Sequence, residues 1–104
     1  MEPNVEDLLA QVQRQQQEIE RIQRGVAEMV VEGGSRQDEV RVKVRGNGQF
    51  TEIDIDPDVL RRSNAHELGD ILVEAVNDGL AKMAAATKAR FAPVLEQAST
   101  PPGQ

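Results

Sequence analysis

Three arginines in the N-terminal third of the chain have the spacing that best suits a chemical role. Arg14, Arg21 and Arg24 stand at i, i+7 and i+10, close to one face of a helix. Guanidinium groups at this spacing can meet successive phosphates of a nucleic acid. Glu18 and Glu20 lie between them and could instead pair with them on a solvated helix face. Both interpretations remain open from the sequence.

A second set of cations lies near the C-terminal end of the chain. Lys82, Lys88 and Arg90 have few acidic neighbours, which makes this stretch locally basic. On a helix these three side chains would be spread around the axis. They are a second candidate set for phosphate contacts.

Three aspartates at alternate positions resemble the opening of a calcium-binding loop. Asp54, Asp56 and Asp58 have the right spacing, but Val59 stands where such a loop needs glycine. Ala65 occupies the place of the bidentate glutamate. We therefore expect no metal site and interpret this segment as a strand end that enters a capped turn.

Composition argues against catalysis and against a general affinity for polyanions. His66 is the only histidine and the chain has neither cysteine nor tyrosine, so we expect no enzymatic activity, cofactor or small-molecule substrate. A cysteine-free chain is compatible with a reducing cytosol. No apolar run is long enough to span a membrane, so we expect a soluble protein. The net charge of -6 requires any anion-binding surface to be local.

The first arginine set would lie on an amphipathic helix that begins after an Asn4 cap and ends near Gly25. Its apolar residues follow heptad spacing. They are Val5, Leu8, Val12, Ile19, Ile22 and Val26. Such a stripe could pack on the protein's own sheet or pair with a second copy.

The stretch VRVKVRGNGQFTEIDIDP, residues 40–57, predicts a β-hairpin. Asn47-Gly48 favours a two-residue type I′ turn, in which both residues have positive φ. The resulting register gives one apolar and one charged face. The apolar pairs are Val44–Thr51, Val42–Ile53 and Val40–Ile55; the opposite face pairs Lys43–Glu52 and Arg41–Asp54, with Phe50 opposite Arg45, whose charge stays free. Residues 27–33 predict a third strand.

A second long helix would begin at Ala65, because Asn64 and Glu67 have the spacing of a capping box, and Pro93 would limit it. We expect one α+β domain over residues 1–92 and a flexible tail over residues 93–104. Helices of about 30 and 40 Å would overhang strands of about 20 Å. A two-fold related copy would cover the overhanging apolar stripes, so we expect a homodimer.

The order helix, three antiparallel strands, helix, with VRVKVRGNGQFTEIDIDPDVL and LGDILVEAVNDGLAKM, resembles the YbaB/EbfC family of bacterial nucleoid-associated proteins. The resemblance covers roughly residues 5–90. It implies a cytoplasmic, nucleoid-associated homodimer whose helices project as a pair of arms and bind duplex DNA without a cofactor or enzymatic chemistry.

Two classes of function follow. The leading hypothesis is a dimer that binds duplex DNA with little sequence preference, through Arg14, Arg21, Arg24, Lys82, Lys88 and Arg90. The alternative is a protein-interaction module, such as a secretion-associated accessory protein, whose acidic helix docks a partner protein and does not bind DNA. The steep salt dependence of phosphate contacts separates the two.

Overall fold

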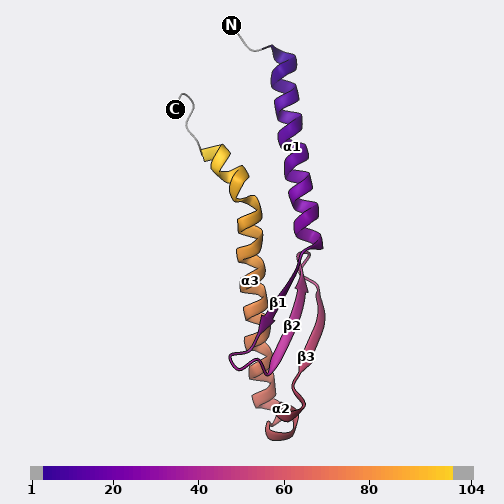
Figure 1. Cartoon of the computed structure of the whole chain (residues 1–104), viewed down its shortest axis with the longest axis vertical. Helices are drawn as coiled ribbons and strands as arrows, with labels where there is room; N and C mark the ends of the chain where they lie inside the picture. Colours follow the sequence, from indigo (N-terminus) through magenta and orange to yellow (C-terminus); the bar gives the residue numbers. More distant parts are fainter. Residues whose placement is uncertain (1–3, 100–104) are drawn as a thin grey trace.

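The computed structural model describes residues 4–99, and the side chains of residues 4–95. The molecule is elongated, measuring 74 × 25 × 16 Å. Two long helices rise from a small sheet and lie side by side beyond it (Figure 1). The elements in chain order are α1 (Val5–Glu28), β1 (Val30–Gly34), β2 (Val40–Arg45), β3 (Phe50–Ile55), α2 (Pro57–Arg62) and α3 (Ala65–Ser99).

Helix α1 begins where the sequence predicts and ends later. The side chain of Asn4 accepts a hydrogen bond from the backbone N–H of Glu6 at 3.2 Å, which confirms the predicted cap. The predicted end at Gly25 was wrong, because the helix continues to Glu28. One glycine costs a helix only about 1 kcal/mol, and the buried side chain of Val26 holds the last turn in place.

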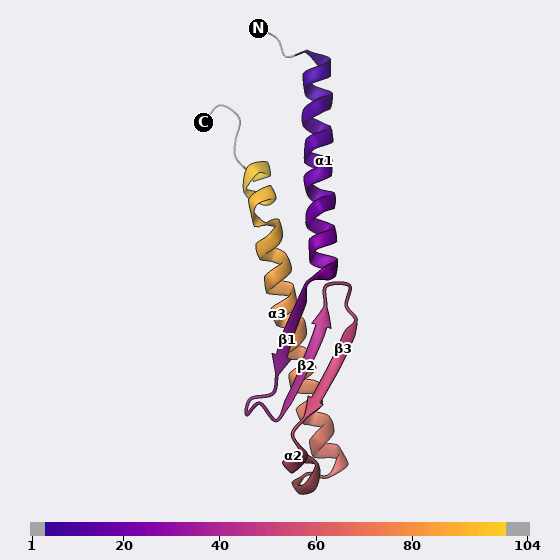
Figure 2. The same ribbon diagram turned by 45° about the vertical axis from the view of Figure 1, so that its right-hand side comes forward.

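The three strands form an antiparallel sheet in the order β1-β2-β3, with α3 packed across β1 and β2 (Figure 2). The core lies between this helix and the central strand, where Val40, Val42 and Val44 are at most 1% exposed. Ala75 of α3 packs against them. The predicted α+β class, with a long helix at each end of a three-stranded sheet, is thus confirmed.

The β2–β3 hairpin keeps the predicted register up to Lys43–Glu52 and then changes. A β-bulge after Lys43 pairs Val44 with Phe50 instead of Thr51. Phe50 therefore packs against the core, and its predicted position opposite Arg45 was wrong. The change of register follows from the geometry of the turn at Gly46–Gly48.

The predicted type I′ turn was wrong as well. Gly48 has a φ of 86°, whereas Asn47 is not among the described residues with positive φ. The N–H of Gly48 donates to the carbonyl of Arg45 at 2.8 Å, and the N–H of Arg45 donates to the carbonyl of Gln49 at 2.8 Å. This is the type I turn followed by a left-handed glycine that forms a three-residue hairpin loop.

Helix α3 starts at Ala65 as predicted, and the side chain of Asn64 accepts the N–H of Glu67 at 2.8 Å. The predicted stop at Pro93 was wrong: the helix passes through this residue to Ser99, and its ribbon bends near that end (Figure 1). A proline removes one helical hydrogen bond and bends the helix without having to end it. The predicted flexible tail over residues 93–104 stays a prediction, and residues 100–104 lie outside the described part.

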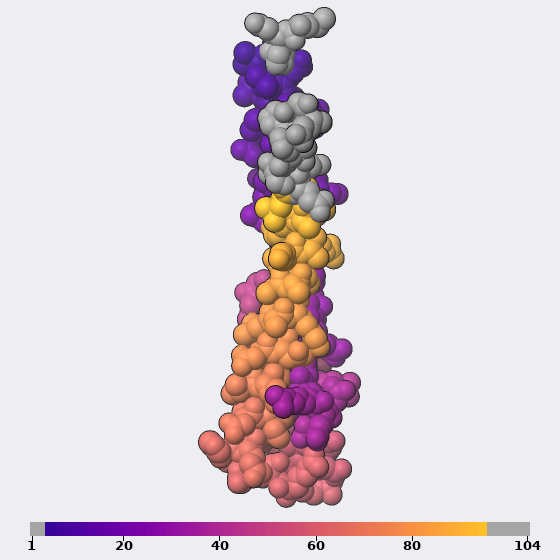
Figure 3. Space-filling model, turned by 90° about the vertical axis from the view of Figure 1, so that its left-hand side faces the viewer, coloured from indigo at the N-terminus to yellow at the C-terminus, as the bar shows by residue number. Residues whose placement is uncertain are grey.

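Helix α3 approaches β1 closely enough to exclude side chains at the contact. A Cβ on Gly33 would overlap the backbone of Gly79. Both glycines are buried. A glycine inside a helix weakens it, but Gly79 lets α3 lie directly on the strand. The space-filling view shows the β1–β2 loop lying against this part of α3 (Figure 3).

Candidate nucleic-acid interface

The arm of the molecule is the part where α1 and the second half of α3 project beyond the sheet (Figures 1 and 2). The two helices contact each other. On α1, Val26 is buried and Ile19 and Ile22 are half-buried, while Phe91 is half-buried on α3. The apolar stripe of α1 therefore turns towards α3 in the half nearest the sheet.

The three arginines of α1 lie on the outward face of this arm. A helix advances about 100° per residue, which places Arg14, Arg21 and Arg24 roughly opposite the apolar stripe. All three side chains are exposed. The geometry leaves them open to a ligand that runs along the outer side of α1.

Only one of these arginines has an ionic partner among the described residues. The Nη2 atom of Arg21 lies 2.6 Å from Oε1 of Glu18, and both side chains are largely exposed. An exposed pair of this kind contributes at most about 1 kcal/mol, so a phosphate can compete for the arginine. Arg14 and Arg24 form no ion pair within residues 4–95, and neither does Glu20.

The basic residues of α3 do not form one surface. Lys82 lies 2.9 Å from the carboxylate of Asp78. Lys88 and Arg90 are exposed and have no ion pair in the described part of the chain. Their positions on the helix point them to different sides, about 160° apart. The fold therefore leaves Lys88 and Arg90 as separate free charges beside α1.

The fold separates charge along the molecule in a way that no single segment shows. Residues 5–28 hold five acidic and three basic residues, and residues 79–95 hold three basic residues and no acidic one. With Glu96, the one acidic residue of the last turn of α3, these two stretches, which include the arm, have a net charge of 0. Residues 29–78, which form the sheet end, hold eleven acidic and six basic residues, a net of -5.

The outer face of the sheet has mixed charge. Lys43 pairs with Glu52 at 3.2 Å, as the register predicts. Arg41 stands opposite Asp54 in the ladder, yet the two form no ion pair among the described residues. Arg45 is also without an ionic partner there. Acidic neighbours on both flanking strands keep this face from being a basic patch.

A cavity of about 520 Å³ lies between the β1–β2 loop and α3, and sequence reasoning missed it. Two carboxylates of α3, one helical turn apart, bind the end of β1 and the loop after it. Asp78 accepts the N–H of Gly34 at 2.9 Å, and Glu74 accepts the N–H of Arg36 at 2.5 Å. The Gly34 N–H, followed by Lys82, lowers the pKa of Asp78. Because the protein's own carboxylates occupy these donors, the cavity offers little to a phosphate.

The residues considered for metal or acid–base chemistry have structural contacts. Asp56 caps α2 by accepting the N–H of Asp58 at 3.0 Å, and Asp58 lies 3.3 Å from Arg61. His66 is exposed and lies 3.7 Å from Asp70. Within the described residues, no three potential metal ligands come together. No described helix is both long and apolar enough to cross a membrane.

Together the fold and the arm define a small α+β protein with two helices projecting from one end of its sheet. A sequence profile of the YbaB/EbfC DNA-binding family matches residues 1–98, and the chain belongs to this family. The resemblance noted in the sequence is thus confirmed.

Relatives named "nucleoid-associated protein" align over most of the chain. One from Mycolicibacterium vanbaalenii is 32% identical over 93 residues, covering 89% of this chain and 84% of the relative. One from Lactococcus lactis is 30% identical over 88 residues, covering 85% and 89%. The crystal structure of an uncharacterized Helicobacter pylori protein has a TM-score of 0.70 at 18% identity, covering 90% and 99%, and shows the shared fold.

Proposed function

We propose that this protein binds duplex DNA with little sequence preference, as a homodimer, in the cytoplasmic nucleoid. The observation that carries the proposal is the separation of charge: the two stretches that include the arm, residues 5–28 and 79–99, are neutral overall in a chain whose total is -6. A duplex can approach the arm while the acidic sheet end turns away from it. Membership of a DNA-binding family and the names of the relatives support this proposal.

The contacts we propose are to phosphates. The candidate residues are Arg14, Arg21, Arg24, Lys82, Lys88 and Arg90. They are arginines and lysines on helix surfaces, and the free ones are spread along the arm. Contacts of this kind position a protein on DNA without reading bases. Binding should therefore differ little between sequences, and the protein needs no cofactor or catalytic residue for this role.

An uncovered apolar surface supports the homodimer. Ile53 of β3 is 51% exposed, although its cross-strand partner Val42 is 1% exposed, because α3 covers β1 and β2. Val73 and Leu80 of α3 are 59% and 45% exposed. They lie on the side of α3 away from Asp78, which binds β1, and hence on the side towards β3. A second copy would bury this surface.

The tip of α1 supports the alternative function, docking of a partner protein. Val5, Leu8, Leu9 and Val12 are 47 to 68% exposed, and the only charges of the first two turns are acidic. A contiguous apolar strip beside acidic residues suits a protein partner better than it suits DNA. This alternative becomes the leading one if DNA binding is absent.

The direct test is fluorescence anisotropy with labelled duplexes of two unrelated sequences, titrated from about 50 to about 200 mM salt. We expect similar affinities for both duplexes and a steep loss with salt. For variants that replace an arginine of α1 by glutamine, the charge-matched control is Arg61→Gln, since Arg61 is an exposed cation at the opposite, acidic end of the molecule and its loss should leave binding unchanged. Absence of binding by wild type at the lowest salt would reject the proposal.

A further inference from the structure

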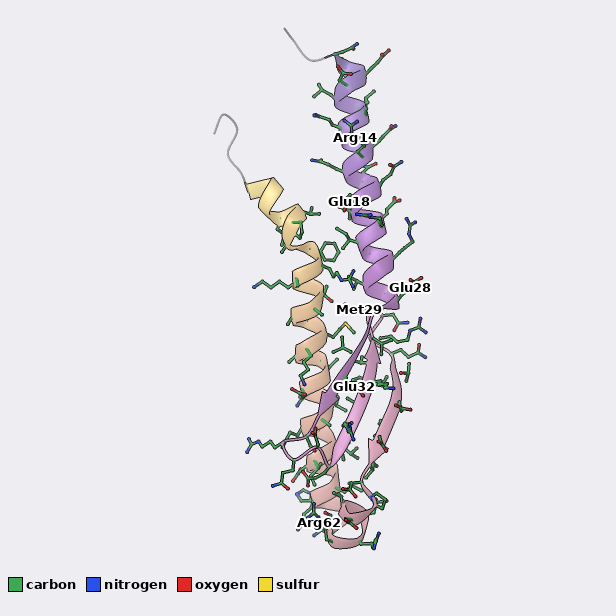
Figure 4. All side chains as sticks on the ribbon, viewed as in Figure 1. Arg14, Glu18, Glu28, Met29, Glu32 and Arg62 are labelled. Atoms are coloured by element: carbon green, nitrogen blue, oxygen red, sulfur yellow. The ribbon has the colours of Figure 1, made fainter. Side chains whose placement is uncertain are left out.

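The direction of the arm is decided at a small joint, the elbow, formed by Val26 to Met29 and by Gly46. Helix α1 ends here: the N–H of Met29 donates to the carbonyl of Val26 at 3.1 Å. The N–H of Gly46 then donates to the carbonyl of Met29 at 2.9 Å. This bond extends the β1–β2 ladder one pair beyond Val30–Arg45. Figure 4 shows Glu28 and Met29 at this point, where α1 meets the strands.

The last turn of α1 rests directly on the backbone of the β2–β3 turn. A Cβ on Gly46 would overlap the carbonyl oxygen of Val26 and would lie 3.2 Å from Cα of Ala27. These are backbone atoms, so no side-chain rotation could make room. Gly25 and Gly48, the nearest other glycines, have no such neighbour within 4 Å. The close approach is therefore specific to Gly46.

Both sides of the elbow are fixed to rigid parts of the molecule. The turn that holds Gly46 is closed by two backbone hydrogen bonds of 2.8 Å, between Arg45 and Gln49 and between Gly48 and Arg45. On the helix side, Val26 is only 9% exposed. The turn and the helix end consequently move as one unit.

We propose that Gly46 is a positioning residue that sets the direction of the α1 arm relative to the sheet and to α3. Its consequence for DNA rests on the proposed function, because the arm's direction decides where Arg14 and Arg24 stand beside a duplex. Helix α1 has 24 residues, so it is about 36 Å long and a tilt of about 10° at the elbow moves its tip by about 6 Å. The same tilt moves Arg14, about 21 Å from the helix end, by about 4 Å and Arg24 by only about 1 Å, so it separates Arg14 from a phosphate that it would otherwise contact.

The arm's direction can be measured without DNA. The chain lacks cysteine, so Gln13→Cys on α1 and Ala81→Cys on α3 give two defined spin-label sites. Double electron–electron resonance on labelled chains diluted with unlabelled protein then reports the distance within one chain. Wild type should give one narrow distribution. A broad distribution would overturn the proposal, because it would show that the elbow does not hold the arm.

The variant Gly46→Ala should move the mean of this distance by up to about 4 Å, since the added methyl group must displace the last turn of α1 and a tilt of about 10° moves Gln13, about 22 Å from the helix end, by that amount. Gly25→Ala is the matched control, because it adds the same methyl group next to the elbow without a neighbour, and its distance should equal that of wild type. Circular dichroism establishes that each variant is folded. A folded Gly46→Ala with the wild-type distance would overturn the proposal; if this variant unfolds, the wild-type distribution decides.

A DNA titration of the same variants separates this inference from the proposed function. If wild type binds DNA, Gly46→Ala should bind more weakly, although its charges are unchanged, and Gly25→Ala should bind as wild type. An equal affinity for Gly46→Ala would overturn the functional half of the inference. If wild type does not bind DNA, the proposed function fails, while the spin-label distances still support or refute the role of Gly46 in the arm.

Discussion

Replacing the outward arginines of α1 by glutamine tests the interface most sharply, because only one of the three has an ionic partner among the described residues. Arg14 and Arg24 form no ion pair in the described residues, whereas Arg21 lies 2.6 Å from Glu18. Glutamine removes the charge and keeps helix propensity. Each phosphate contact adds about 0.9 to the magnitude of the slope of log K against log salt on duplex DNA. The single variants Arg14→Gln and Arg24→Gln should therefore each lower this magnitude by about 0.9 per arm that contacts the duplex.

The triple variant, with Arg21→Gln added, should lower the slope by up to about 2.7 per contacting arm. Because slope and affinity are linked, a wild type that makes these three contacts loses an additional factor of about 40 between 50 and 200 mM salt, and the variant does not. The assay is the anisotropy titration with both duplexes.

The ion pair of Arg21 supplies an internal control. Glu18→Gln removes the competing carboxylate at 2.6 Å and one repulsive charge, so it should strengthen DNA binding. Light scattering and circular dichroism should show unchanged assembly and folding in all these variants. A triple variant that binds with the full wild-type slope would refute the assignment of contacts to α1. Lys88→Gln with Arg90→Gln would then be the next pair to test.

Three further outcomes are expected. Light scattering should give twice the chain mass of 11.4 kDa, and Leu80→Glu should give the monomer by placing a charge in the exposed apolar surface; a monomeric wild type would contradict the proposed dimer. Gly48→Val should lower the free energy of unfolding in urea by about 1 to 3 kcal/mol, since φ at this residue is 86°; an unchanged midpoint would contradict the left-handed turn. Asp78→Asn should destabilise the protein at neutral pH. The folded pKa of Asp78 is lowered from 3.8, chiefly by the Gly34 N–H, so its contribution is complete above that pH and disappears as pH falls through the folded pKa. Urea unfolding should show the two proteins converging in acid; a constant difference would contradict the contact.

Sequence periodicity was sufficient for the two long helices, the three strands and most of the strand register, whereas the six-residue helix α2 was missed, because it is too short to show a helical period. The alternation around Asn47-Gly48 located the hairpin, but it did not decide whether Asn47 takes positive φ, and the bulge that moves Phe50 into the core depends on that choice. The ends of α1 and α3 were missed for a related reason. Gly25 and Pro93 are unfavourable locally, and the helices continue through them.

The candidate interface depends on contacts between distant parts of the chain, which a pattern within one segment does not reveal. The sequence placed three arginines on one face of α1, but the direction of that face became defined only when α3 was seen beside the opposite stripe. In the same way, the basic residues between positions 79 and 95 offset the acidic charge of α1 only because the fold places α3 beside α1. Likewise, Glu74 binds Arg36 of the β1–β2 loop, which is 38 positions away in the sequence, and Asp78 binds Gly34 at the end of β1, which is 44 positions away.

The exposed first half of α1 has a thermodynamic consequence. From Val5 to Glu18 every side chain except Ala10 is exposed, so no tertiary contact of any size supports this half of the helix. The second half of α1, which packs beside α3 and at the elbow, supplies the helical nucleus for it, so this half adds its turns without the cost of nucleation and frays from its Val5 end. Any partner that binds the frayed first turns must offset the conformational entropy that is lost when they become ordered. A substitution that changes helix propensity in the glutamine-rich stretch around Arg14 should therefore change the affinity for the partner, even where the substituted residue does not touch it.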